Sequence, residues 1–219
     1  MDRNDFSRIL WAWIRTLVER APMPRRPVVV GLSAPQGAGK TTVTTALCRM
    51  AGEEQLRVVG LSIDDFYLTR TEQLALSRRH FGNRFLEHRG YPGTHDVALG
   101  KHVLGALKQL RAEDEVALPC YDRSAAQGRG DRRPESDWPR ATGPLDLVIL
   151  EGWMLGFEPV DDHAIVDPQL RPVNELLRSY AAWTALLDAF IWLNAEDHRF
   201  VVDWRAEAKL TRENPDVEA

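Results

Sequence analysis

The chain has 219 residues, of which 44% are hydrophobic and 27% are charged, and its formal net charge is −4. These values are typical of one globular domain with a sizeable core. They argue against a disordered chain and against a protein that binds nucleic acid or anionic membranes through bulk positive charge. Cys48 and Cys120 lie far apart, without metal-binding or redox spacing, so we expect free thiols and a cytoplasmic location.

Residues 1–24 are predicted to form an amphipathic helix that packs on a single domain spanning 1–219. Apolar residues recur at helical spacing in MDRNDFSRILWAWIRTLVERAP, with charged residues between them. The segment lacks the uninterrupted apolar stretch of a signal peptide, and no run in the chain is long enough to span a membrane. We therefore expect no membrane partner.

Short apolar runs alternate with helical patterns along the rest of the chain. The runs predict strands at 27–33, 56–63, 145–152 and 189–194. Helices are expected to begin at Gly39, at Asp96, at Asp167-Pro168 (continuing through Leu187) and at Asp197 (continuing through Trp204). This alternation predicts an α/β fold, a parallel sheet with helices on both faces.

The longest segment without a clear pattern is 119–144, which contains five arginines. A loop of this length in a compact domain is usually functional or disordered, so we expect it to serve the site. Trp183 and Trp192 are both expected in the core.

The segment APQGAGKT, residues 34–41, fits a phosphate-binding P-loop with alanine in place of the first glycine. Glycine lets successive backbone N–H groups point at one phosphate, and the helix that follows adds its positive N-terminal end. Lys40 is expected to reach the β- and γ-phosphates of ATP, and the Thr41 hydroxyl to bind Mg²⁺. The location between an apolar strand and an amphipathic helix supports this interpretation over a plain glycine-rich turn.

Two further carboxylate sites follow predicted strands. Asp64 and Asp65 follow the second strand, and Glu151 ends the third, so both sites lie at the edge where open α/β sheets bind ligands. A phosphoryl-transfer enzyme needs one carboxylate near the acceptor hydroxyl and another near Mg²⁺. Asp64 and Asp65 could instead only cap the next helix. A GTPase switch is disfavoured, because no DxxG follows the third strand and NAED (194–197) lacks the lysine of NKxD.

The P-loop, SIDDFYLT, GNRFLEHRGYPGTHD, PCYDRSAAQGRGDR, GPLDLVILEGWMLGF and VDPQLRPVN occur in the order found in plant and cyanobacterial D-glycerate 3-kinases. The chain resembles this family over about residues 27–212. The family consists of P-loop kinases similar to phosphoribulokinase, uridine kinase and pantothenate kinase. The resemblance implies transfer of the ATP γ-phosphoryl group to D-glycerate, giving 3-phosphoglycerate.

The resemblance also implies roles for individual residues. The residues that match the ATP cradle are Gly37, Ala38, Gly39, Lys40, Thr41 and Thr42. Lys40 would neutralise charge on the transferred group, Asp64 would be the general base, and Glu151 would be the Walker B acid that orients Mg²⁺.

On the acceptor side, the resemblance points to Asp65, Tyr67, Arg89, His95, Tyr121 and Asp122. Because an anionic acceptor needs a guanidinium, Arg89, Arg129 and Arg132 are candidates to bind its carboxylate, unless they only form a solvated basic loop. Arg205, with Lys209 and Arg212, could begin a lid over the phosphates.

Family members continue beyond the point where this chain stops, which implies that the C-terminal part of the fold is missing. Two other functions stay open: a kinase for a neutral alcohol such as a nucleoside or for pantothenate, and an ATP-binding protein without kinase activity. The arginines of 119–144 favour a carboxylate acceptor over a nucleoside, and the set Lys40, Asp64 and Glu151 favours catalysis. The sequence carries no signal for oligomeric state.

Overall fold

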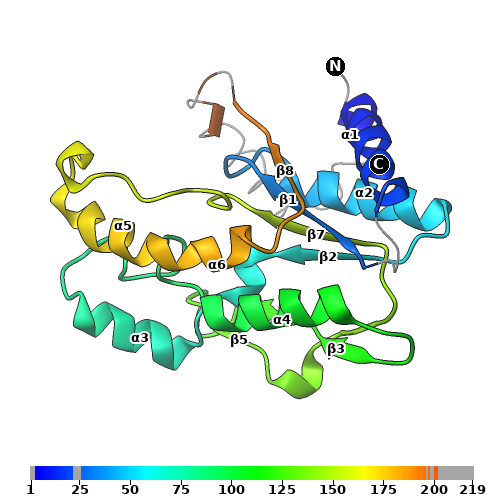
Figure 1. Cartoon of the computed structure of the whole chain (residues 1–219). Helices are drawn as coiled ribbons and strands as arrows, with labels where there is room; N and C mark the ends of the chain where they lie inside the picture. The colour runs from blue at the N-terminus through cyan, green and yellow to red at the C-terminus, as the bar shows by residue number, and fades with distance from the viewer. Residues whose placement is uncertain (1–2, 22–25, 196, 198–199, 202–219) are drawn as a thin grey trace, which may run out of the picture.

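The computed structural model describes residues 3–21, 26–195, 197 and 200–201. Its centre is a four-stranded sheet in the order β2-β7-β1-β8, in which every neighbouring pair is parallel (Figure 1). The strands are β1 Val28–Ser33, β2 Val58–Ser62, β7 Leu147–Gly152 and β8 Ala189–Trp192. The four strands lie where the sequence predicts them, and the parallel α/β fold is confirmed.

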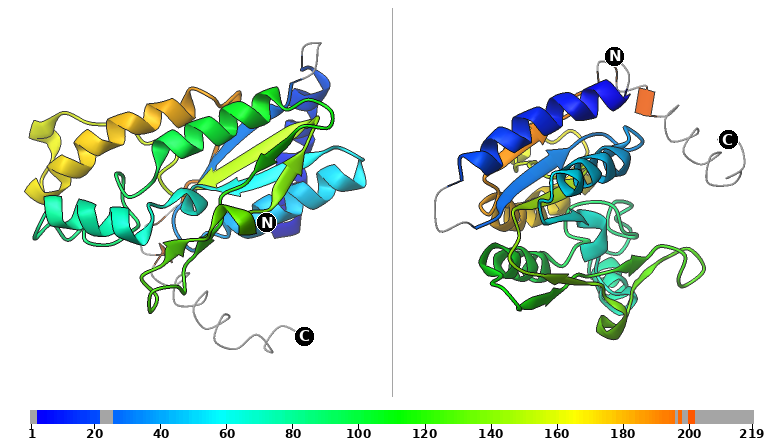
Figure 2. Two further views of the ribbon diagram at one scale, coloured as in Figure 1. Left: turned by 90° about the horizontal axis from the view of Figure 1, so that it is seen from below. Right: turned by 90° about the vertical axis from the view of Figure 1, so that its right-hand side faces the viewer.

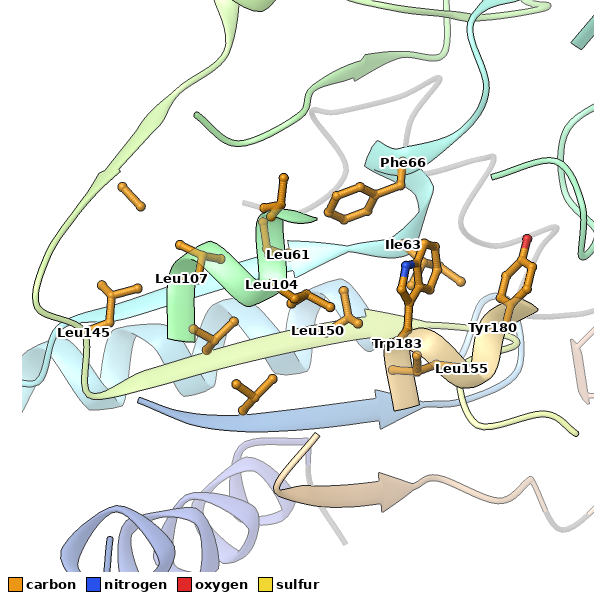
Figure 3. Close-up of a cluster of buried hydrophobic side chains, with 14 of the residues drawn as sticks. Leu61, Ile63, Phe66, Leu104, Leu107, Leu145, Leu150, Leu155, Tyr180 and Trp183 are labelled. Carbon is orange, nitrogen blue, oxygen red and sulfur yellow. The ribbon is translucent and has the colours of Figure 1, made fainter. Parts of the chain in front are cut away.

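Helices cover both faces of this sheet. On one face, α1 (Arg3–Glu19) and α2 (Lys40–Glu53) pack on Val30, Leu32 and Ile149. On the other face, α4 (Val97–Gln109) and α6 (Ala181–Thr184) pack on Val29, Val148 and Leu150 (Figures 2 and 3). Successive strand residues point to opposite faces, so two apolar layers require strands that are hydrophobic throughout. All residues of β1 and β7 are buried.

The single helix expected from Asp167 through Leu187 is wrong. The structure has the 3-10 turn η4 (Pro168–Leu170), α5 (Arg171–Leu177), the 3-10 turn η5 (Arg178–Tyr180) and then α6. Leu177, Tyr180 and Trp183 follow one another at intervals of three residues and are all buried. A 3-10 turn aligns residues i and i+3, so the tighter winding directs all three into the core. Most of the helix expected at Asp197 lies outside the described residues.

The segment 119–144 is not irregular throughout. Strand β4 (Tyr121–Asp122) pairs antiparallel with β5 (Asp131–Arg132), and β6 (Arg140–Thr142) pairs with β3 (Glu115–Ala117). The 3-10 turn η2 (Glu135–Asp137) lies between these pairs. Strands of two or three residues are too short to leave a readable alternation in the sequence.

Two further elements connect β2 to α4. The 3-10 turn η1 (Ile63–Phe66) directly follows β2, and α3 (Arg70–Arg79) comes next; a last 3-10 turn, η3, spans Asp162–Ala164. A capping box begins α3. The Thr69 side chain accepts a hydrogen bond from the backbone N–H of Glu72, and the Glu72 carboxylate accepts one from the backbone N–H of Thr69. No helix in the described part of the chain is both long and apolar enough to cross a membrane.

Candidate active site

The P-loop connects the end of β1 to the start of α2. Gly37 and Gly39 have φ angles of 83° and 80°, in the left-handed region that favours glycine. A Cβ on Gly39 would meet no atom within 4 Å, so its backbone conformation, not space, requires glycine. Gly39 is the N-cap of α2 and receives no side-chain cap, so the free N–H groups of the first turn face the loop. This is the arrangement that binds phosphate.

Lys40 closes the loop with its side chain. Its Nζ donates to the carbonyl oxygens of Ala34 at 3.0 Å and Pro35 at 2.9 Å. Burial lowers the Lys40 pKa, and the carboxylates of Glu151 and Asp64 oppose that effect. The ammonium therefore lies on two carbonyl oxygens beside the loop, where phosphate oxygens could replace them.

Glu151 reaches the loop through the register of the sheet. It pairs with Leu32 on β1 and with Ser62 on β2, and it accepts a hydrogen bond of 3.1 Å from the Thr41 hydroxyl. The side chain is nearly buried, and this burial raises the pKa of Glu151, with Lys40 acting in the opposite direction. A hydroxyl and a carboxylate side by side match the oxygen ligands that Mg²⁺ prefers.

No group of three His, Cys, Asp or Glu side chains within the described ranges could hold a metal by itself. Mg²⁺ in kinases usually binds through one or two protein ligands together with nucleotide phosphates and water. Thr41 and Glu151 are thus suitable ligands for a magnesium–nucleotide complex.

The two neighbouring carboxylates of η1 have different surroundings. Asp64 is partly open and accepts a hydrogen bond of 2.7 Å from Nη2 of Arg123. Asp65 lies deeper, where burial raises its pKa, and it accepts from the backbone N–H of Tyr121 at 3.4 Å. Asp64 is therefore available to an acceptor, whereas Asp65 connects η1 to the β4–β5 hairpin.

Tyr67 and His95 lie beneath this part of the site. Their rings stack with centroids 4.3 Å apart, and His95 Nδ1 lies 2.7 Å from the Tyr180 hydroxyl. Burial lowers the His95 pKa to about 3, so this imidazole is neutral. Burial raises the pKa of the Tyr67 hydroxyl most, and the nearby carboxylate of Asp64 raises it further. Both residues gather at the site, with His95 supporting Tyr67 from below.

The predicted pair Tyr121 and Asp122 forms β4. The guanidinium of Arg89 lies 5.6 Å above the Tyr121 ring. Asp122 Oδ1 accepts from the backbone N–H and the hydroxyl of Ser124, at 2.8 and 2.6 Å. These bonds lower the pKa of the partly exposed Asp122 carboxyl. The carboxylate of Asp122 shapes the turn that carries the next residue, Arg123.

The three arginines expected to bind an acceptor carboxylate already have other partners. Arg132 is mostly buried and donates to Asp96 Oδ2 and the Tyr67 carbonyl. Arg89 donates to the carbonyls of residues 123, 128 and 129, and Arg129 contacts the His88 ring. Their binding roles stay predictions, whereas their contacts within the protein hold 89–95 against the hairpin.

Sequence reasoning did not single out Arg123, although it is the arginine that touches Asp64. Its side chain is about half exposed, at 49%. The one available signal was position, because Arg123 directly follows the YD pair in PCYDRS.

A cavity of about 520 Å³ opens beside the P-loop. Its walls come from Ser33–Gln36, from Arg89–Tyr91 and from aromatic side chains of the β7 and β8 ends. Trp192 stacks on Phe157 there, with centroids 5.8 Å apart, and is 54% exposed, so its expected place in the core is wrong. Trp183, in contrast, is fully buried. Arg205, the predicted lid residue, lies outside the described residues.

No protein-family model matches this chain. Among curated proteins, D-glycerate 3-kinase (chloroplastic) of Arabidopsis thaliana is 42% identical over 188 residues, which are 84% of this chain and 41% of that protein. The uncharacterized kinase mug58 of Schizosaccharomyces pombe is 37% identical over 207 residues, covering 89% of this chain and 74% of the relative. The chain thus spans less than half of the Arabidopsis protein but most of the fission-yeast one.

A solved structure agrees with these relatives. That of D-glycerate 3-kinase from Cryptococcus neoformans superposes with a TM-score of 0.82 at 27% identity, covering 96% of this chain and 81% of that one. The Cryptococcus kinase thus shares the fold of this chain, and the Arabidopsis and fission-yeast kinases share its sequence at 42% and 37% identity. The P-loop with Lys40, the Thr41–Glu151 contact and the carboxylate of Asp64 agree with these similarities: the chain belongs to a family of P-loop kinases that includes the fission-yeast kinase, and it is similar to D-glycerate 3-kinases.

Proposed function

We propose that the protein transfers the γ-phosphoryl group of ATP to a hydroxyl of D-glycerate, giving 3-phosphoglycerate and ADP. The observation that carries the reaction class is the convergence of Lys40, Asp64 and Glu151, since the charges of both carboxylates act on the Lys40 ammonium. The substrate rests on two relatives named D-glycerate 3-kinase.

Each of these side chains has a distinct task in the reaction. Asp64 accepts the proton of the acceptor hydroxyl while the hydroxyl oxygen bonds to the γ-phosphorus. The bond between the γ-phosphorus and the bridging oxygen breaks, and that oxygen leaves with ADP. Lys40 gives up its loop carbonyls and neutralises charge on the transferred group. Thr41 and Glu151 would hold Mg²⁺, which when bound offsets the charge of the phosphates.

Turnover of ATP by the 219-residue chain tests this proposal. ADP release is measured with D-glycerate, L-glycerate, glycerol, uridine, pantothenate or no acceptor, and the product is identified by phosphorus NMR. We expect release that depends on D-glycerate and yields 3-phosphoglycerate. A preference for uridine or pantothenate would assign another alcohol acceptor, and nucleotide binding without any turnover would indicate a binding-only chain.

The remaining features follow the same proposal. The acceptor is a small molecule, and neither nucleic acid nor a membrane is required as a partner. Cys48 and Cys120 are unpaired in the structure, in keeping with the cytoplasmic location that we propose. The substrate-binding roles of Asp65, Tyr67 and Asp122 belong to this proposal as well, and Arg205 remains a proposed lid residue.

A further inference from the structure

The guanidinium of Arg123 lies directly at the general base of the proposed reaction. Its Nη2 is 2.7 Å from Asp64 Oδ2, and Asp64 is the one carboxylate within 4.0 Å of it in the described residues. The charge of Arg123 also acts on Lys40, Asp65 and Tyr67, which places it between the phosphate cradle and the acceptor side.

The backbone around Arg123 is fixed, whereas its side chain has room to move. Asp122 Oδ1 closes the turn by accepting from Ser124 and Ala125, and Arg89 Nη2 donates to the carbonyl of Arg123 at 3.3 Å. The side chain of Arg123 is 49% exposed and that of Asp64 is 26% exposed. An ion pair this open in solvent is weak, so an incoming anion can compete for the guanidinium.

The size of the acceptor matches this arrangement. In a three-carbon acid, the carboxylate and the terminal hydroxyl lie only about 4 Å apart, so both ends can reach neighbouring protein groups. With the hydroxyl on Asp64, the carboxylate falls within reach of a guanidinium that now touches Asp64. A planar guanidinium is also suited to bind a carboxylate through two parallel hydrogen bonds.

We infer that Arg123 is the specificity-determining residue of the acceptor site: it binds the carboxylate of a short hydroxy acid and leaves Asp64 free for the hydroxyl. This inference rests on the proposed function, and it assigns to Arg123 the contact predicted for Arg89, Arg129 and Arg132. The ion pair between Arg123 and Asp64 then forms only while no acceptor is bound. A neutral alcohol has no carboxylate to draw the guanidinium away and so competes poorly for the base.

The test compares D-glycerate with glycerol, which keeps the same hydroxyl groups but replaces the carboxylate by a neutral alcohol. For Arg123→Gln we expect kcat/KM for D-glycerate to fall about 100-fold. That for glycerol should not fall and should rise a few-fold, because Asp64 is then no longer held by the guanidinium. Arg123→Lys keeps the charge but cannot form two parallel hydrogen bonds, so its kcat/KM for D-glycerate should lie between those of the wild type and Arg123→Gln. Arg140→Gln is the matched control, since Arg140 is 55% exposed and contacts one carboxylate, that of Glu115.

Calorimetric titration of D-glycerate, in the presence of a non-hydrolysable ATP analogue, gives a second readout that needs no turnover. Binding should weaken about 100-fold in Arg123→Gln and stay unchanged in Arg140→Gln. If the wild-type chain binds D-glycerate through Arg123 without phosphorylating it, the proposed function fails and the inference stands.

Three results would overturn the inference itself. One is an equal loss for D-glycerate and glycerol, which would place Arg123 on the transferred phosphoryl group. The others are unchanged D-glycerate binding in Arg123→Gln and absence of D-glycerate binding by the wild type. Thermal unfolding of each variant checks the fold, and Arg123→Lys serves if Arg123→Gln does not fold.

Discussion

The proposed phosphate cradle (residues 34–41 and Glu151) and the proposed acceptor side (residues 63–67, 89–95 and 121–132) are held by different kinds of contact. The cradle is fixed by strand register and by contacts inside one loop, such as Lys40 Nζ to the Pro35 carbonyl. The acceptor side depends on side chains that reach distant backbone, as Arg132 reaches the Tyr67 carbonyl and Tyr180 reaches the N–H of Gly93.

This difference separates chemistry from specificity. A cradle built on strand ends presents the same phosphate site whatever the acceptor. An acceptor side assembled from a hairpin, two turns and their long-range hydrogen bonds can change its side chains without disturbing the sheet. Variants should accordingly divide into those that stop transfer but leave acceptor binding, and those that change acceptor binding but leave nucleotide binding.

The largest effect is expected where the two regions meet, at Asp64. Asp64→Asn keeps the size of the side chain but removes the proton acceptor, so kcat with D-glycerate should fall about 10³-fold. Nucleotide affinity, measured by calorimetry, should stay within about twofold of wild type. Survival of most turnover would show that another group serves as the base.

On the cradle side, Glu151→Gln should lower kcat about 100-fold, because a neutral amide is a poorer partner for Mg²⁺ than a carboxylate. The same change should raise the melting temperature. Burial raises the Glu151 pKa above its unfolded value, so the folded state holds the proton more tightly and loses stability as the pH rises through that pKa. Calorimetric melting at pH 7 decides, and a variant that melts below wild type would contradict this account.

The same division marks how far the sequence alone can go. Strand and P-loop patterns are local, so the four strands, Lys40, Thr41 and Glu151 could be predicted and lie together as expected. Helix α3 was missed although the Thr69–Glu72 capping box marks its start. The partner of Arg123 could not be found, since its contact with Asp64 joins residues 59 positions apart and depends on how the hairpin packs.

On the acceptor side, Arg132→Met should destabilise the fold by about 2 kcal/mol. The guanidinium is only 11% exposed, and its removal leaves Asp96 without its cation. Asp96 remains the N-cap of α4 through the Leu99 N–H, so the loss stays below that of a fully buried pair. The KM for D-glycerate should rise while ATP affinity stays unchanged.

A double-mutant cycle isolates the Arg132–Asp96 pair. Asp96→Asn removes the charge but keeps an oxygen for the cap, so Arg132→Met with Asp96→Asn should recover part of the stability in urea unfolding. Strictly additive effects of the two changes would show that the pair contributes no coupling.

The last effect concerns pH and His95, and at pH 7 it is the smallest. Its folded pKa of about 3 lies below the unfolded value of 6.5, so the folded state excludes a proton that the unfolded state takes up. Stability is therefore full above pH 6.5 and declines as the pH falls, by up to about 1.4 kcal/mol per unit from this residue. His95→Gln should flatten that decline in urea unfolding between pH 7 and pH 5, even if its stability at pH 7 is lower through loss of the Tyr67 stacking.

Exposed His102 on α4 provides the control, because His102→Gln should keep the wild-type slope. Equal slopes for wild type and His95→Gln would mean that the stack of His95 on Tyr67 opens to water before the sheet unfolds, and the acceptor side would then be the first part of the site to lose its structure in acid.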